Sequence, residues 1–284
     1  MGSVLIDARD VHANRVLNNT DKFYWYLSGN KASYAGVASP QAGALGLYDI
    51  SYNATVSGSY VLTVFYQGQS VPLPSTPNVI YVSAGGASAS QSYATSELGW
   101  MGEAGVSMRI VFHVVDAFGN LRTGADVSSP DTVVATMSSG SSPTTTFAGS
   151  NLGDSGKYAI TIVSTNATLY EVSYAINGAA ATSKDSFGVA PSSASPTMST
   201  IAESAGGNAL PSVMCGARLK VTLQSRDQYG NPLVSSTDGF ATTASHSEPV
   251  TIQYVGNGRY EIEYASTAAG LHTINVALGS GRFE

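Results

Sequence analysis

Three aspartates at regular spacing are the residues that could do chemistry in this chain. Asp10, Asp116 and Asp227 are 106 and 111 residues apart, and an asparagine follows each of them four positions later. Carboxylate and amide oxygens could bind calcium or serve in acid–base catalysis. A tight turn explains the same residue types, because Asp accepts bonds from nearby backbone amides, while Gly and Asn tolerate positive φ.

We therefore predict structural turns here, with a calcium site at a junction as the alternative. No catalytic residue, cofactor or resident metal is expected. The predicted turn residues are Asp10, Asn14, Asp116, Gly119, Asn120, Asp227, Gly230 and Asn231. In the first copy Ala13 stands where the other two have glycine, so its turn should be strained or of another type.

A second candidate for catalysis is the run Gly153–Gly156, which has the order found around the nucleophile of trypsin-like serine proteases. That chemistry needs a histidine base and a buried aspartate beside the serine. His113 is the only histidine between residues 84 and 190, and it lies in a predicted strand next to a different turn. The histidines of the chain are also too scattered for a zinc site. We predict a turn, and a chain that is not an enzyme.

The elements around these turns repeat. Tyr48, Tyr158 and Tyr260 each lie in an alternating run, and twelve residues later come Tyr60, Tyr170 and His272. Alternation of apolar and polar residues is typical of half-buried strands, and copies of about a hundred residues are the size of small antiparallel sandwiches. We predict an all-β chain of three tandem β-sandwiches with Tyr48, Tyr60, Tyr158, Tyr170 and Tyr260 in their cores.

The predicted boundaries are residues 1–83 for unit one, 84–190 for unit two and 191–284 for unit three. Units two and three have residues ahead of their first matching strand that unit one lacks, and unit three stops where the others continue. We expect unit one to lack its first strand and unit three its last, which would leave exposed sheet edges.

Composition narrows the classes of function. Charged residues make up 11% of the 284 residues and the net charge is -6, so no basic surface is available for nucleic acid. Cys215 is the only cysteine, which rules out an intrachain disulfide. No apolar run reaches the length of a membrane span, and the N-terminal residues do not form a signal peptide.

Residues 21–27 are dense in aromatic side chains at alternating positions. Either the pair Tyr24 and Tyr26 or the set Phe23, Trp25 and Leu27 must point away from the core. The first alternative is a core tryptophan on a central strand, and the second is an exposed aromatic patch of the kind that anchors interfaces. Asn18, Asn53 and Asn166 begin possible glycosylation sequons, in a number that chance would also give.

The order of these pieces resembles the filamin-type immunoglobulin-like repeat. Residues 46–52, 57–64 and 68–72 supply the pattern in unit one, and residues 269–276 supply its second part in unit three. The closing strand departs from the family pattern, since its Pro-Phe signature is only loosely echoed at Pro77–Val79 and Ser186–Phe187. The resemblance implies immunoglobulin-like sandwiches used as rods, as docking sites or as adhesive ectodomains.

The resemblance and the composition together give an expected function. We expect a non-catalytic rod in a large cell-surface protein that mediates protein–protein or cell–cell contact, its partner being a surface receptor or another copy. The alternative is a cytoplasmic filamin-like scaffold that binds cytoskeletal partners by strand addition. Neither alternative involves nucleic acid or membrane insertion by this stretch. The strands expected to bind are those containing Val134, Thr136 and Thr242.

Overall fold

The computed structural model describes residues 2–71, 78–96, 99–123, 130–140, 142–153, 155–202, 212–235, 239–245 and 248–279. Every regular element in these ranges is a β-strand, and none of them contains a helix long and apolar enough to cross a membrane. The predicted all-β class is confirmed. Each sheet takes its strands from one of the three predicted units.

Unit one contains a small sheet of order β1-β5-β4 and a larger one in which β3, β2, β6 and β7 are neighbours and β8 also pairs with β6. All of its ladders are antiparallel. The strands are β1 (Gly2–Asp7), β2 (Phe23–Gly29), β3 (Ser33–Val37), β4 (Ser39–Pro40), β5 (Leu47–Tyr52), β6 (Gly58–Tyr66), β7 (Gln69–Val71) and β8 (Val79–Val82).

Unit two has one sheet of order β14-β15-β11-β9 and a second of order β10-β17-β16-β12-β13. The pairing of β10 with β17 is parallel, and the other ladders are antiparallel. The strands are β9 (Tyr93–Ser96), β10 (Met101–Glu103), β11 (Met108–His113), β12 (Val133–Ser139), β13 (Ser142–Ala148), β14 (Ser150–Asn151), β15 (Lys157–Ile162), β16 (Leu169–Ile176) and β17 (Ala179–Ala190).

Unit three repeats this plan with a sheet of order β18-β19-β22-β21 and the pair β20-β23. Its strands are β18 (Thr200–Ala202), β19 (Arg218–Gln224), β20 (Phe240–Ala244), β21 (Val250–Gly256), β22 (Arg259–Ala265) and β23 (Ile274–Leu278). Among the described residues, β23 pairs with β20 alone. In unit one β1 pairs with β5 alone, whereas its counterparts β11 and β19 also pair with β9 and β18.

Each unit has its own apolar core, as the alternating sequence requires of a two-layered sandwich. Tyr48, Tyr158 and Tyr260 occupy corresponding positions in the three cores and are 0%, 4% and 5% exposed. Tyr60 and Tyr170 are buried as well. The cores are separate clusters, so each sandwich gains its stability mainly from its own side chains.

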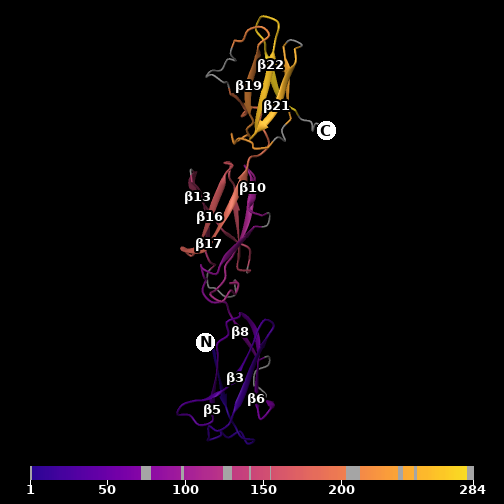
Figure 1. Ribbon diagram of the computed structural model, residues 1–284. Helices are drawn as coiled ribbons and strands as arrows, with labels where there is room; N and C mark the ends of the chain where they lie inside the picture. The colour runs from indigo at the N-terminus through magenta and orange to yellow at the C-terminus, as the bar shows by residue number, and fades with distance from the viewer. Residues whose placement is uncertain are drawn as a thin grey trace.

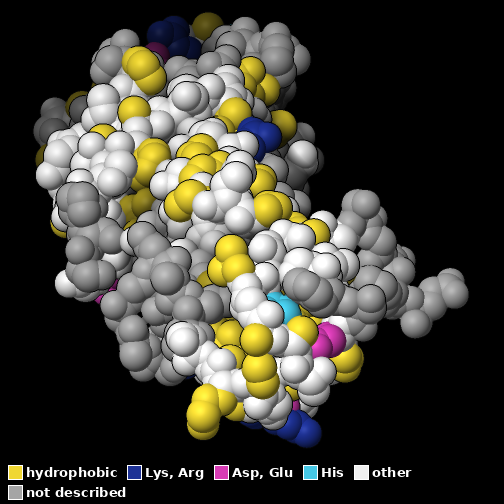
Figure 2. Space-filling view, turned by 90° about the horizontal axis from the view of Figure 1, so that it is seen from above, with side chains coloured by type: hydrophobic (Ala, Val, Ile, Leu, Met, Phe, Trp, Pro, Cys, Tyr) yellow, Lys and Arg dark blue, Asp and Glu magenta, His cyan; other side chains and the backbone are white. Residues whose placement is uncertain are grey.

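The three units follow one another lengthwise, with unit one at the indigo end and unit three at the yellow end (Figure 1). Figure 2 looks down on the unit-three end. Uncharged atoms make up most of the visible surface there, and charged side chains are few and scattered. This agrees with the low charged fraction of the sequence.

The aromatic strand β2 has the first of its two possible orientations. Phe23, Trp25 and Leu27 point into the core of unit one and are 7%, 7% and 0% exposed. Tyr24 and Tyr26 therefore lie on the outer face of the larger sheet. The structure thus contains both a core tryptophan and exposed aromatic side chains on one strand, because successive residues of a strand face opposite sides.

Candidate functional site

The repeated aspartates cap tight turns. In unit two the Asp116 carboxylate accepts hydrogen bonds from the backbone amides of Phe118 and Asn120 at 2.8 and 2.9 Å. Its second oxygen accepts from the side chain of Asn120 at 2.8 Å and from the amide of Gly85 at 2.9 Å. Four donors thus surround a carboxylate that is only 2% exposed, which offsets the cost of burying its charge.

Unit three repeats this arrangement almost atom for atom. Asp227 accepts from the amides of Tyr229 and Asn231 at 2.9 Å each, from the Asn231 side chain at 2.8 Å and from the amide of Ser192 at 3.0 Å. Gly85 and Ser192 lie at the start of their units, ahead of the first strand. The aspartate therefore fixes both its own turn and the segment by which its unit begins.

Unit one has the same turn without the fourth donor. Asp10 accepts from the amides of His12 and Asn14 at 2.9 Å and from the Asn14 side chain at 3.2 Å, and it is exposed. Ala13 has a φ of 65°, close to the 82° of Gly119 and the 87° of Gly230. The turn type is thus conserved between the copies, and alanine adopts the left-handed conformation at an energetic cost.

Hydrogen bonding lowers the pKa of both buried aspartates. Burial alone would raise the pKa of Asp116, but the bonds donated by Asn120, Gly85 and Phe118 outweigh it and hold the pKa below its usual range. The pKa of Asp227 is lowered in the same way by Asn231, Ser192 and Tyr229. Both side chains are therefore anions that already have partners, and proton transfer to a substrate is not a role that suits them.

The second repeated position forms a corner like that of immunoglobulin domains. The hydroxyl of Tyr60 donates to the carbonyl of Val56 at 2.8 Å, and that of Tyr170 donates to the carbonyl of Asn166 at 3.2 Å. In unit three His272 Nε2 lies 3.0 Å from the Ala268 carbonyl. Since a carbonyl only accepts, Nε2 bears a proton, and Nδ1 lies 2.7 Å from the Tyr264 hydroxyl.

The protease-like run is part of a turn. Ser155 Oγ bonds the Leu152 carbonyl at 3.2 Å, and Asp154 lies outside the described residues. His113 contacts β9, with its Nε2 3.1 Å from Thr95 Oγ1 and its ring stacked on Tyr93. Among the described residues, no three His, Cys, Asp or Glu side chains are grouped so that they could hold a metal ion.

The structure corrects the strand expected to bind in unit two. Val134 and Thr136 lie in β12, which pairs with β16 on one side and with β13 on the other. A strand cannot be added to an edge whose hydrogen bonds are already made. In unit three Thr242 lies in β20, and of the described strands only β23 pairs with it. Strand addition is therefore geometrically possible at β20, whereas the sheet of unit two that contains β12 has its edges at β13 and β10.

Tyr24 and Tyr26 of the aromatic stretch 21–27 belong to a wider exposed surface on the outer face of the larger sheet of unit one. Strands β2, β3, β6, β7 and β8 contain no Asp, Glu, Lys, Arg or His. Tyr24 lies opposite Val37 and Phe65, and Tyr26 lies opposite Ala35 and Thr63. The large apolar side chains exposed here are Tyr24 (48%), Tyr26 (41%), Val37 (52%), Val61 (50%) and Tyr81 (77%). We call these five residues the tyrosine face.

Unit two differs from unit one in this respect, whereas β20 and β23 of unit three also contain no charged residue. On the corresponding sheet of unit two, Lys184 pairs with Glu171 at 2.8 Å. In unit three the ion pair of Lys220 with Glu261, at 2.7 Å, lies on the other sheet, on β19 and β22, the counterparts of β1 and β5. Charged residues are depleted at the centres of protein interfaces, where aromatic residues are enriched. The signal for this face was present in the sequence as strands without charge, but only the sheet order shows that they are neighbours.

The three sequon asparagines, Asn18, Asn53 and Asn166, are all exposed. Asn53 and Asn166 lie in corresponding loops, ahead of the corner residues Tyr60 and Tyr170. Both loops are therefore accessible to modification, and their use as glycosylation sites stays a prediction.

Comparison with known proteins identifies the fold. A scan against protein-family models gave no match, and neither did a sequence search of curated proteins. Among solved structures, the chain is similar to FdeC, described as a broadly conserved Escherichia coli adhesin, with a TM-score of 0.59 and 21% identity over 98% of this chain and 88% of that one. It is also similar to InvD of Yersinia pseudotuberculosis, with a TM-score of 0.50 and 20% identity over 99% and 80% of the two chains.

A filamin domain from Lin-41 matches 37% of this chain and 97% of its own, with a TM-score of 0.30 and 15% identity. The assignment of tandem immunoglobulin-like sandwiches rests on the two longer matches. At these identities the likeness concerns the fold. The filamin-type family, like the adhesive function, remains a proposal.

The turn of unit one offers a test of backbone strain. We expect Ala13→Gly to stabilise unit one by about 0.5–1 kcal/mol, because glycine removes the cost of a left-handed alanine but adds chain entropy to the unfolded state. Gly119→Ala should destabilise unit two by about 1–2 kcal/mol, and since an added Cβ would meet no atom within 4 Å, the effect is one of backbone conformation. Urea unfolding of both variants measures this, and equal shifts of the same sign would contradict it.

The buried aspartates predict a pH dependence. Because the folded pKa of Asp116 is lowered, its contribution to stability is present above the unfolded value of about 3.9 and is lost as the pH falls through the lower folded value. We expect Asp116→Asn to be less stable than the wild type by about 1–3 kcal/mol at pH 7. That difference should shrink in urea titrations below pH ~3.9. A difference that stays constant down to pH 2.5 would show that ionisation does not matter.

Proposed function

We propose that this chain is a non-catalytic adhesive segment of a larger cell-surface protein, and that it contacts a protein partner through the tyrosine face of unit one. The observation that supports this most directly is the absence of charge from all five strands of that sheet, combined with three exposed tyrosines. Tyrosine offers a large contact area with a polar tip and loses little conformational freedom when it is buried.

The fold supports the same proposal. The three sandwiches follow one another lengthwise, as expected of a rod that presents one face of a unit to a partner (Figure 1). The chain shares its fold with FdeC, an adhesin, over nearly its whole length. The partner would be a surface receptor or another copy of the protein, and repeated weak contacts along several copies would add up through high effective concentration.

A second candidate function is supported by the outer edge of β20. In the described residues this strand pairs only with β23, so a partner peptide could add a strand beside Thr242. This is the mode expected of a cytoplasmic filamin-like scaffold. The two candidates differ in location, in the part of the chain that binds and in the chemistry of the partner.

Location is tested by treating intact cells that make the parent protein with an impermeant protease and blotting for this segment. An adhesive ectodomain should lose its signal without permeabilisation. Protection of the segment until the membrane is permeabilised would contradict the cell-surface proposal and favour the scaffold. A cytosolic protein blotted in parallel shows that the cells stayed intact.

The binding face is tested with beads that display the chain and are scored for capture on those cells and on one another. We expect the double substitution Tyr24→Ser and Tyr26→Ser to lower capture at least about tenfold, since removing an interface hot spot costs about 2 kcal/mol or more. Both side chains point outward, so the unfolding midpoint should hardly change. Leu169→Ser, at an exposed apolar position of β16, is the matched control. Equal capture by all three chains would contradict the proposed face.

A further inference from the structure

The last residue of the repeated turn reaches across to the preceding unit. Asn120 Nδ2 donates to the carbonyl of Thr55 at 2.8 Å, and Asn120 Oδ1 accepts from the amide of Ser57 at 2.9 Å. A planar carboxamide has a donor and an acceptor side by side, so it matches a carbonyl and an amide of one extended loop. This pair of bonds joins unit two to unit one.

The second joint has the same chemistry at corresponding residues. Asn231 Nδ2 donates to the carbonyl of Thr165 at 2.8 Å, and Asn231 Oδ1 accepts from the amide of Ala167 at 2.9 Å. In both joints the carbonyl and the amide belong to residues two positions apart. The same two bonds recur at both joints, and the preceding unit supplies only backbone groups to them, which indicates a built contact.

Each asparagine is held in position by its own turn. The Nδ2 group has two hydrogens, and the one that does not reach the preceding unit goes to the aspartate, at 2.8 Å in both units. Because a carboxylate and a carbonyl can only accept, these two bonds fix which end of the carboxamide is nitrogen. The same aspartate oxygen accepts from Gly85 or Ser192 in the segment that leads into the unit.

The loop on the other side of each joint is held as well. Val56 lies between Thr55 and Ser57, and its carbonyl accepts the hydroxyl of Tyr60. Asn166 lies between Thr165 and Ala167, and its carbonyl accepts the hydroxyl of Tyr170. The corner tyrosine therefore fixes the middle residue of the three that face the asparagine, so both partners are ordered before they meet.

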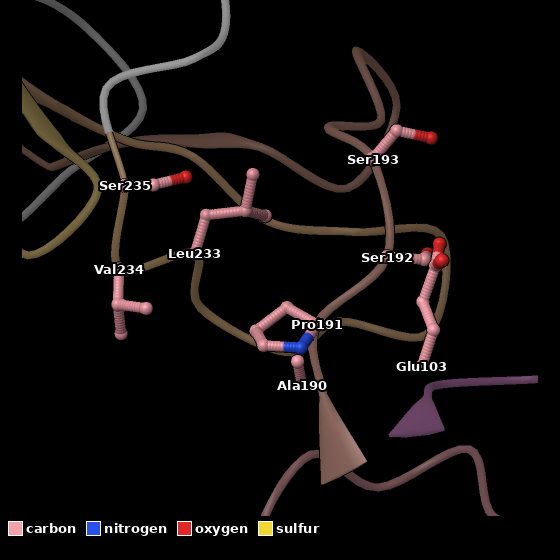
Figure 3. A pocket seen from close by; sticks show the side chains of 8 residues that line it. All are labelled: Glu103, Ala190, Pro191, Ser192, Ser193, Leu233, Val234 and Ser235. Atoms are coloured by element: carbon pink, nitrogen blue, oxygen red, sulfur yellow. The ribbon is translucent and has the colours of Figure 1, made fainter. Parts of the chain in front are cut away.

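The two joints differ in their apolar contacts. A hollow of about 460 Å³ lies at the joint of units two and three, lined by Glu103, Ala190, Pro191, Ser192, Ser193, Leu233, Val234 and Ser235 (Figure 3). Tyr229 does lie against Gly105 of unit two, so closely that a Cβ there would overlap its ring. Its counterpart at the first joint, Phe118, is 67% exposed. The contact common to both joints is the asparagine pair of bonds.

We propose that Asn120 and Asn231 are inter-unit clamps, which recognise a loop of the preceding immunoglobulin-like unit and fix the orientation between neighbours. The two residues of each turn then have different roles. The aspartate accepts a hydrogen bond from the segment that leads into its own unit, and the asparagine bonds a loop of the preceding unit. The partner recognised is a carbonyl and an amide two residues apart, above a corner tyrosine. The clamp rests on these contacts and not on the adhesive function, so either proposal can fail alone.

Unit one provides a matched control within the chain. Asn14 bonds Asp10 in its own turn as Asn120 bonds Asp116, and among the described residues its carboxamide contacts no other unit. Asn14→Ala therefore removes the bond within the turn only. Asn120→Ala and Asn231→Ala remove the bond within the turn and the clamp together. The difference between the two kinds of variant isolates the contact between units.

The experiment measures residual dipolar couplings of the full chain in a dilute aligning medium. In the wild type, the couplings of all three units should fit one common alignment tensor. In Asn120→Ala, unit one should lose the common tensor while units two and three keep it, and in Asn231→Ala unit three should separate from units one and two. Asn14→Ala should leave the common tensor intact.

The proposal is overturned if Asn120→Ala and Asn231→Ala keep the common tensor, or if Asn14→Ala loses it to the same extent. The amide chemical shifts of each unit report whether it is still folded. Ser57→Pro repeats the test from the other side of the joint, because it removes the amide donor in unit one and leaves the turn of unit two untouched. A common tensor retained in Ser57→Pro would likewise contradict the clamp.

Discussion

The structure depends most on a buried carboxylate that is fully supplied with hydrogen-bond donors. Asp116 and Asp227 are 2% and 0% exposed, and without their four donors each would be an unpaired buried charge. This requirement explains the residue types that recur around them. Glycine is needed where φ is positive, and asparagine is needed because its side chain donates back to the carboxylate while its amide also bonds it. The fourth donor is a backbone amide of the segment that leads into the unit, from Gly85 or Ser192. The aspartate can therefore be buried with all its donors only when that segment is in place.

The same sandwich plan can serve different purposes in the three units because its outer faces are free to vary. The inner positions must fill a core, and one of them is a buried tyrosine in all copies, at Tyr48, Tyr158 and Tyr260. The outer positions of unit two include the ion pair between Lys184 and Glu171, which keeps that face hydrated. Unit one has tyrosines and no charge on the corresponding sheet. A repeated core tyrosine combined with divergent outward residues lets the same sandwich plan present different surfaces.

Sequence alone could predict what depends on neighbouring residues and not what depends on distant ones. The alternation around Tyr48 and the turn at Asp116 were predictable, because a strand period and a turn are local properties. The open edge of the sheet in unit two was not predictable. Val134 lies in a strand that is paired on both sides, and only the order of strands in the sheet shows this. The reach of Asn120 was hidden for a different reason. A local turn already accounts for an asparagine at that position, so nothing in the pattern indicates a second contact.

A joint made of two hydrogen bonds has a different mechanical character from a joint made of apolar surface. Each such bond adds about 0.5–1.5 kcal/mol net, so a clamp contributes on the order of 1–3 kcal/mol. A free energy of that size keeps the joint closed most of the time, yet it is well below the 5–15 kcal/mol typical for unfolding a domain. Under load the clamps should therefore open before any sandwich unfolds. Because Asp116 and Tyr60 keep both halves ordered, an opened joint can close again without refolding. A chain of this kind would bend at its joints before any core unfolds, so the fold of each sandwich is preserved under load.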